Sequence, residues 1–206
     1  MKRIIILLAI FAITPQLFAQ TTFPGDVYVK GGLNMHSITG SNISATDYMG
    51  LGYNVVFGYE KPLGTSENLL YNYEVGLGTR GSWYVKDGVD SKMTDHAIQI
   101  AMNIIYRIAL AEGQALDFHA GLGTTADMFG KSVTKATAAG QTIKTEVSLG
   151  DYGSGFRRSD IVIMPGFTYW FGKFGLDVCW QRGLIAMSQD DDTCASNILF
   201  RVAYKF

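Results

Sequence analysis

One stretch, HAIQIAMNIIYRI at residues 96–108, limits the possible fold more than any other part of the chain. Its even positions are almost all apolar, whereas its odd positions include Gln99, Asn103 and Arg107. Successive side chains of a β-strand point to opposite faces of the sheet. The segment is therefore predicted to be a strand with one apolar face and one polar face.

The same alternation recurs along the chain and predicts an all-β fold. Beyond the N-terminus, no stretch has the roughly 18 nearly uninterrupted apolar residues of a transmembrane helix. We expect an eight-stranded antiparallel transmembrane β-barrel of the up-and-down type, with ten strands as the alternative if residues 131–158 add a hairpin. A soluble ligand-binding barrel would alternate too, so further features have to decide. The expected strands cover residues 26–37, 48–60, 70–83, 96–108, 115–130, 158–171, 174–188 and 197–206.

The charge balance excludes one class of function. Charged residues make up 17% of the chain, against about 25% in a typical soluble domain, and the net charge is -1. A nucleic-acid-binding protein would show a basic face, for which this balance gives no support. The composition instead suits a surface that is partly apolar and partly hydrated.

The N-terminus has the features of a targeting segment. A basic start precedes the apolar run IIILLAIFAI (4–13), and Ala19 offers a small residue for cleavage. We therefore divide the chain into a signal peptide, residues 1–19, and an outer-membrane β-barrel domain, residues 20–206. The alternative is an uncleaved membrane anchor, for which the run is short.

The positions of the aromatic residues favour the membrane barrel over the soluble one. If the mature chain starts in the periplasm, nine outward-facing aromatic residues fall at the periplasmic ends of the strands. A ring at one level is what an aromatic girdle at a membrane interface requires. The girdle is predicted to comprise Tyr59, Tyr71, Tyr73, Tyr106, Tyr169, Phe171, Phe174, Tyr204 and Phe206.

The predicted connections support the same orientation. Compact connections near residues 111–114 and 172–173 alternate with longer polar ones. Short periplasmic turns and longer external loops are typical of outer-membrane barrels. The predicted external loops cover residues 39–47, 86–92, 131–158 and 189–193.

The inward-facing positions carry charges of both signs. An eight-stranded barrel has an interior that side chains just fill. Buried charges have to be paired, and equal numbers of the two signs therefore predict a plugged lumen with an internal salt-bridge network. A narrow conducting lumen is the alternative, although no ring of one sign is evident. The predicted inward set is Lys30, Glu60, Glu74, Arg80, Arg107, Asp117, Asp127, Asp177, Arg201 and Lys205.

The sequence offers little support for catalysis or metal binding. His36 and Ser37 are adjacent and would therefore point to opposite faces of a strand. Cys179 is expected opposite residue 202, too far from Cys194 for a disulfide. We predict no catalytic, cofactor or metal site and expect that the chain is not an enzyme, with a lipid-modifying enzyme as the alternative from that class.

The chain resembles the PorT-like, porin-family outer-membrane β-barrel proteins of Bacteroidota. The resemblance rests on VKGGLNM (29–35), WQRGLIAMS (180–188) and the closing YKF (204–206), and it covers the mature chain. The terminal Phe206 resembles the C-terminal signal that the outer-membrane assembly machinery reads. The resemblance implies location and fold, because the family has no single shared activity.

The predicted function follows from these features. We expect a monomeric barrel in the bacterial outer membrane, in contact with its lipid, that acts as a structural, adhesion or docking protein through its external loops. The long loop 131–158 is the candidate site for an extracellular ligand. The alternative is a small pore for ions or solutes.

Overall fold

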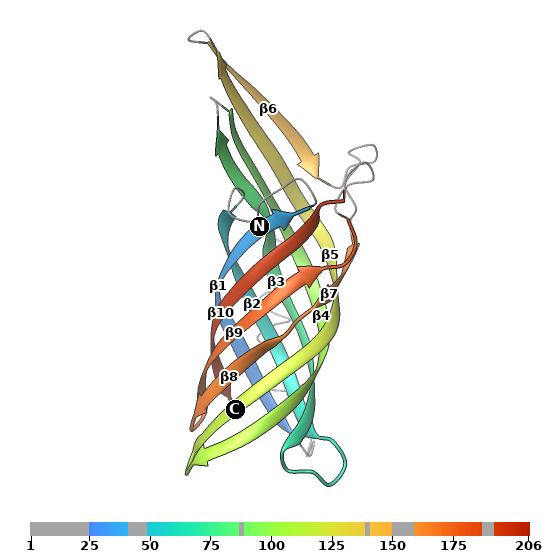
Figure 1. Cartoon of the computed structure of the whole chain (residues 1–206), viewed down its shortest axis with the longest axis vertical. Coiled ribbons are helices and arrows are strands. Elements are labelled where there is room, and N and C mark those ends of the chain that lie inside the picture. Colours follow the sequence, from blue (N-terminus) through green and yellow to red (C-terminus); the bar gives the residue numbers. More distant parts are fainter. Residues whose placement is uncertain (1–24, 41–48, 87–88, 139–140, 150–158, 187–191) are drawn as a thin grey trace, which may run out of the picture.

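The computed structural model describes residues 25–40, 49–86, 89–138, 141–149, 159–186 and 192–206. In this part of the chain, ten strand segments form a single antiparallel sheet (Figure 1). The segments are β1 (Asp26–Thr39), β2 (Met49–Pro62), β3 (Leu69–Lys86), β4 (Val89–Ala111), β5 (Gln114–Ala138), β6 (Gln141–Leu149), β7 (Ser159–Ile163), β8 (Gly166–Phe171), β9 (Phe174–Gly183) and β10 (Cys194–Lys205).

The sheet closes into a barrel because β10 pairs with β9 on one side and with β1 on the other. β7 and β8 together occupy the place of one strand, since each pairs with both β5 and β9. Pro165 separates the two segments, because proline has no N–H to give to the ladder. The Trp180 N–H still donates to the Pro165 carbonyl oxygen at 2.9 Å. The wall thus has eight strands within the described residues, and the predicted eight-stranded barrel is confirmed.

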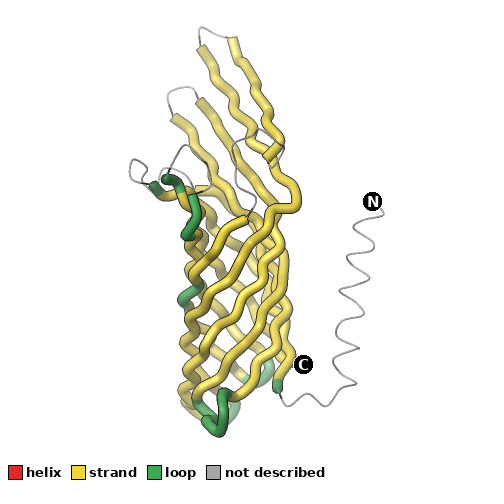
Figure 2. The backbone as a smooth tube through the Cα atoms, turned by 90° about the vertical axis from the view of Figure 1, so that its right-hand side faces the viewer, coloured by secondary structure: helices red, strands yellow, loops and turns green. Residues whose placement is uncertain are grey.

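The two ends of the barrel differ. At one end, two-residue turns join β4 to β5 and β8 to β9, with Gly113 at φ 70° and Gly172 at φ 62°. This positive φ is a conformation that glycine adopts without steric cost. We call this the turn end. The opposite end is the hairpin end, because β3–β4 and β5–β6 extend beyond the wall there (Figure 2).

The extended hairpins correct two loop predictions. β3 pairs with β4 as far as Lys86 and Val89, so most of the predicted loop 86–92 is strand. Within the predicted loop 131–158, β5 continues to Ala138 and pairs with β6, which is the hairpin that the ten-strand alternative anticipated. These segments carry polar residues on both faces and only scattered apolar ones such as Ile143 and Val147, so hydrophobic alternation is weak there. The predicted strand 174–188 is also too long, because β9 ends at Gly183.

A β-bulge in β5 changes which residues face outward. His96 of β4 lies opposite Phe129, whereas Ala97 lies opposite Asp127, so Met128 has no partner of its own. An extra residue in one strand reverses the side-chain alternation beyond it. Asp127 therefore faces inward and Phe129 outward, although both positions are odd. Phe129 therefore belongs to the outer surface of the barrel.

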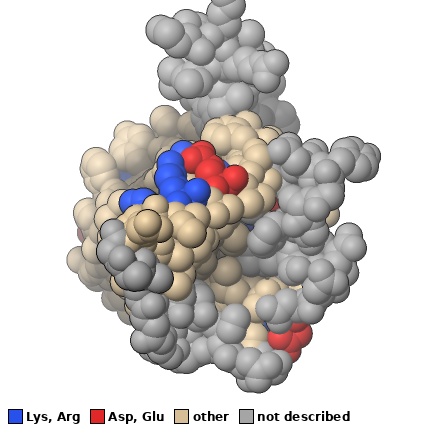
Figure 3. Space-filling view, turned by 90° about the horizontal axis from the view of Figure 1, so that it is seen from above, with Lys and Arg blue, Asp and Glu red and all other residues tan. Residues whose placement is uncertain are grey.

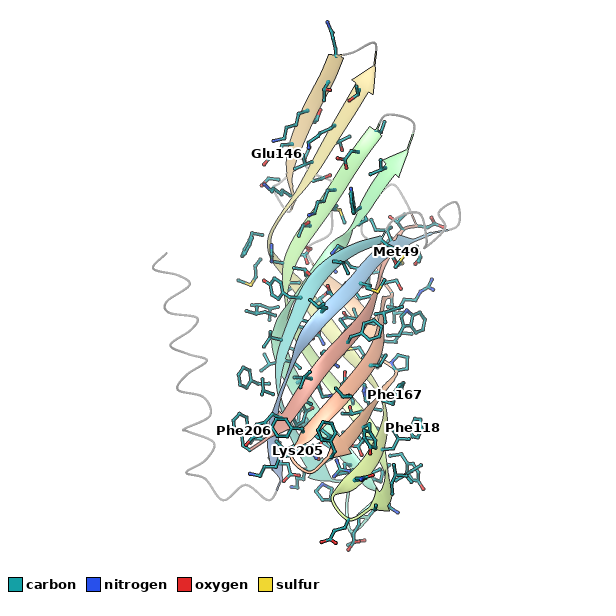
Figure 4. All side chains as sticks on the ribbon, turned by 90° about the vertical axis from the view of Figure 1, so that its left-hand side faces the viewer. Met49, Phe118, Glu146, Phe167, Lys205 and Phe206 are labelled. Atoms are coloured by element: carbon teal, nitrogen blue, oxygen red, sulfur yellow. The ribbon has the colours of Figure 1, made fainter. Side chains whose placement is uncertain are left out.

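The two faces of the wall have opposite character (Figure 4). Inward-facing residues are buried and include many polar and charged side chains. Outward-facing residues are apolar and exposed, among them Leu33, Leu51, Val75, Ile100, Leu122, Leu176 and Val202. Soluble monomers rarely expose a continuous apolar belt, and such a surface marks a site of membrane or protein contact. No helix in the described part of the chain is long and apolar enough to cross a membrane.

Candidate functional site

The barrel interior is lined by ion pairs, beginning at the turn end. The carboxylate of Glu60 accepts hydrogen bonds from Arg107 at 2.8 Å and from Lys205. Arg107 also donates two bonds to Asp117, at 2.8 and 2.7 Å. The indole N–H of Trp170 donates to Asp117 at 2.8 Å, and the Lys205 ammonium lies 4.3 Å from the centre of the Trp170 ring. These contacts tie five strands together across this mouth of the barrel.

Asp177 is the centre of a second cluster deeper in the barrel. Its carboxylate accepts bonds from Lys30 at 2.8 Å and from Nε of Arg201 at 2.8 Å. Thr168 donates to it at 2.7 Å, and Nε2 of His119 lies 3.2 Å away. The side chains of Asp177 and Arg201 are both 0% exposed. A charge buried this deeply needs such partners, because an unpaired ion in a medium of low dielectric costs several kcal/mol.

Glu74 extends this cluster through groups that the charge pattern did not reveal. Nζ of Lys30 lies 3.1 Å from Glu74, and the Tyr28 hydroxyl donates to the same carboxylate at 2.8 Å. Asn72 donates to the Tyr28 oxygen at 2.6 Å, and Asn103 donates to Asn72 at 2.7 Å. Tyr28 and Asn72 have the inward alternation of Lys30 and Glu74. Attention to all inward polar residues, and not only to charges, would have found them.

Arg80 forms the third cluster, toward the hairpin end. It lies 3.3 Å from Asp95, 2.5 Å from Asp127 and 3.6 Å from Asp160, and it donates to Thr125 at 3.1 Å. Asp95 and Asp160 were absent from the predicted set. The expected equality of inward charges therefore does not hold, because one guanidinium faces three carboxylates here.

Amide side chains and apolar groups fill the space between the charged clusters. Asn197 donates to Gln181 at 2.9 Å, Gln181 to Gln99 at 3.3 Å, and Arg201 to Asn54 at 3.0 Å. Met164, Cys179 and Leu199 pack beside them with Ala101 and Val162. A cavity lined by the amides and Arg80 has a volume of about 10 Å³. That is space for about one water molecule.

The predicted girdle residues lie on the outer surface, many of them in contact. Ring centroids are 6.2 Å apart for Tyr169 and Phe171, 6.1 Å for Phe171 and Phe174, 5.2 Å for Phe174 and Tyr204, and 5.4 Å for Tyr204 and Phe206. On other strands, the Tyr71 and Tyr73 centroids are 5.6 Å apart, and Tyr59 and Tyr106 also point outward. Sequence reasoning missed Phe118 and Phe167, which are paired across β5 and β8 and exposed beside the same end (Figure 4).

The β5–β6 hairpin carries charged side chains in water. Nζ of Lys144 lies 3.2 Å and Nζ of Lys131 3.6 Å from the Glu146 carboxylate. The hydrogen bond from Lys144, together with the charge of Lys131, holds the pKa of Glu146 below its usual range. Viewed from the hairpin end, Lys or Arg atoms lie beside Asp or Glu atoms on this exposed surface (Figure 3).

The remaining candidate residues do not converge. His36 is buried inside the barrel, whereas the Ser37 hydroxyl donates to the Ser196 carbonyl at 3.3 Å. Cys179 and Cys194 are free thiols; Cys179 pairs with Leu199 and not with residue 202, because the register of β9 and β10 centres their hairpin slightly earlier in the chain than predicted. In the described residues, no three His, Cys, Asp or Glu side chains are grouped to hold a metal ion.

Comparison with known proteins identifies the fold. No family model matches the chain, and no curated protein matches its sequence. The outer-membrane enzyme PagL matches with a TM-score of 0.51 and 15% identity, covering 85% of this chain and 97% of PagL. The attachment invasion locus protein Ail of Yersinia pestis matches with a TM-score of 0.48 and 13% identity, over 89% of this chain and 100% of Ail. Neisserial surface protein A matches with a TM-score of 0.49 and 15% identity, over 87% and 97% of the two chains. The chain therefore has the fold of small outer-membrane β-barrels.

The likeness to PagL overturns one prediction. The expectation that the chain is not an enzyme was wrong as a deduction from its architecture, because PagL, an outer-membrane enzyme, shares the fold. The physical reason is that the wall of such a barrel can hold catalytic side chains without any change in strand order, so the strand order does not distinguish enzymes from non-enzymes. Function has to be argued from sites, and the fold admits both enzymes and non-enzymes.

Proposed function

We propose that this chain is an integral protein of the bacterial outer membrane, of the PorT-like group, in which residues 1–19 are removed on export. The exposed apolar belt and the ring contacts from Tyr169 to Phe206 support this location. The turn end would face the periplasm, where compact turns are usual. The closing strand, which ends in Phe206, would be the segment that the assembly machinery reads.

The same proposal includes a closed lumen. Three layers of ion pairs, centred on Asp117, Asp177 and Arg80, cross the interior one above the other. The cavity of about 10 Å³ that the amides and Arg80 line has room for about one water molecule, which supports a closed lumen. Ions would have to break buried pairs in order to pass, at a cost of several kcal/mol per pair. The barrel is therefore a rigid support and not a conduit.

The role that fits a rigid, closed support is docking or adhesion at the cell surface by a monomeric barrel. The observation that carries this proposal is the extension of β3, β4, β5 and β6 as one sheet beyond the wall. β4 and β5 are 23 and 25 residues long, about twice the 9–11 residues that a strand needs to cross a bilayer. The surplus length holds polar side chains away from the membrane, where an extracellular partner can reach them.

Two measurements test the proposal together. Single-channel recording of the refolded mature chain in planar bilayers is expected to be silent for the wild type, and steady conductance would refute the closed lumen. An Arg107→Ala variant, which opens the mouth at the turn end, is the matched comparison. Cells that express the chain are expected to adhere to each other or to coated surfaces more than cells with residues 131–149 replaced by a two-residue turn. Equal adhesion would refute docking through this hairpin.

A further inference from the structure

A groove on the outer surface lies where the wall meets the projecting sheet. It has a volume of about 670 Å³ and is formed by β4, β5 and β6. Its lining includes His96 and Phe129, whose rings stack with centroids 4.6 Å apart. The Tyr53 hydroxyl lies 3.0 Å from Nδ1 of His96 and supports this aromatic floor from β2. The floor is apolar and is held in place by contacts from three strands.

The upper part of the groove is basic. Lys92 of β4 lies directly opposite Val133 of β5, and Lys131 is two positions away from Val133 on the same face. Diagonal neighbours on adjacent strands are about 7–8 Å apart, a distance that one phosphate group bridges between two ammonium groups. Glu146 of β6, the other neighbour of β5, lies opposite Val133, but its carboxylate is already paired with both Lys131 and Lys144. Within the described residues, Lys92 forms no ion pair, so the groove keeps a net positive charge.

The position of the groove identifies the kind of ligand. Along β4, His96 is followed by the exposed Ile98 and Ile100 of the apolar belt. The bulge at Met128 turns Phe129 to the same side, 59% exposed. An apolar floor that continues into the belt, with lysines above it, matches a molecule with acyl chains below and an anionic head above. A soluble acidic peptide would satisfy the lysines but would leave the aromatic floor without a matching group.

We propose that this groove binds the phosphorylated headgroup of an outer-leaflet glycolipid. This inference rests on the proposed membrane location. The phosphate contacts Lys92 and Lys131, while the hydroxyls of Thr94 and Ser148, which also line the groove, are placed to donate to head-group oxygens. The first acyl carbons pack on Phe129. Bound lipid would thus anchor the base of the projecting sheet to the membrane surface.

The test uses the full mature chain in nanodiscs of phosphatidylcholine. The probes are lipid A, which carries phosphates, and the same lipid after enzymatic removal of its phosphates, with binding measured by native mass spectrometry. The wild type is expected to prefer the phosphorylated lipid. A Lys92→Gln/Lys131→Gln variant is expected to bind it about 25-fold more weakly, and each single variant about fivefold, as for lysines near an anionic surface. Glu146→Gln is expected to bind it more tightly, because the variant releases Lys131.

The control is Lys173→Gln, an exposed lysine at the turn end, which should leave the affinity unchanged. Equal binding of the two lipids by the wild type would overturn the proposal, as would unchanged binding by the double variant. Competition by a soluble poly-glutamate peptide, or by inorganic phosphate at equal concentration, would assign the groove to a soluble anion instead. Heat-modifiable gel migration and nanodisc insertion report on the barrel itself. Failure to insert would refute the membrane location, whereas insertion without a phosphate preference would refute only the groove.

Discussion

Replacement of Asp177 by Asn tests whether buried charge pairing stabilises the barrel. In the wild type, this carboxylate is the shared partner of Lys30 and Arg201, at 2.8 and 2.7 Å. After the change, Lys30 keeps the Glu74 carboxylate at 3.1 Å, whereas Arg201 keeps only neutral acceptors, the Asn54 oxygen and the amide oxygen of the new side chain. The variant thus leaves a guanidinium buried at 0% side-chain exposure without a directly paired anion.

The magnitude follows from this loss. Removal of one partner from a buried pair costs about 3–5 kcal/mol, mostly because the other charge stays buried. With a slope of about 2 kcal/mol per molar urea, the unfolding midpoint should fall by about 2 M. A suitable control is Asp26→Asn, because Asp26 is 58% exposed and 3.6 Å from Lys205. Exposed pairs contribute about 0–1 kcal/mol, so this variant should move the midpoint by less than about 0.5 M.

The assay is urea unfolding of the refolded chain in lipid vesicles, followed by heat-modifiable gel migration and by tryptophan fluorescence. Coincident transitions from the two probes would justify a two-state free energy. A shift for Asp177→Asn no larger than the shift for Asp26→Asn would refute the claim that the central cluster stabilises the fold. A conducting but stable Asp177→Asn barrel would likewise show that the pair closes the lumen without supporting the wall.

Three further predictions concern other parts of the barrel. Arg80→Met should lower the unfolding midpoint more than Arg107→Met in the same urea assay. The first change leaves three carboxylates close together without their cation, whereas the Arg107 side chain is 21% exposed, so water can partly replace it. A membrane-impermeant maleimide should label Cys194 in the folded protein but label Cys179 only after unfolding, because Cys179 is 0% exposed. Mass spectrometry of peptides measures the labelling, and a labelled Cys179 in the folded protein would contradict its burial. Replacement of residues 131–149 by a short turn should leave the free energy of unfolding within about 0.5 kcal/mol of the wild-type value, and a larger loss would show that the projecting sheet supports the wall.

The membrane-spanning part of the fold could be predicted because its alternation is strong. Residues 96–108 alternate without interruption, and the observed β4 presents these residues as predicted. The same rule placed Lys30 and Arg201 inside, where the structure has them. It missed Asp95, which lies just before the predicted start of that strand. The inward and outward alternation continues through Asp95. The outward residues before Ile98 are polar, however, so the sequence pattern no longer distinguishes the two faces there.

Other errors have local physical causes. Alternation cannot show where a bulge reverses it, so Met128 was not recognised as an unpaired residue in β5. Pro165 lies inside the predicted strand 158–171, and only the pairing of the residues on both sides of it shows that it divides one strand into two. The residue opposite Cys179 depends on where the hairpin of β9 and β10 is centred along the chain. No sequence pattern fixes that centre, so residue 202 was predicted where the structure has Leu199.

Buried charges also explain why one part of this sheet is predictable and another is not. A slip of β10 by one residue against β9 would turn Arg201 toward the lipid and leave Asp177 inside without this partner, at a cost of several kcal/mol. The interior clusters therefore fix the register of the wall more strictly than apolar packing alone would. Above the membrane, β5 and β6 place polar residues such as Lys135 and Thr134 on both faces, so a slip there costs little. The same freedom would let the hairpin sequence vary without loss of the barrel, as the proposed docking role requires.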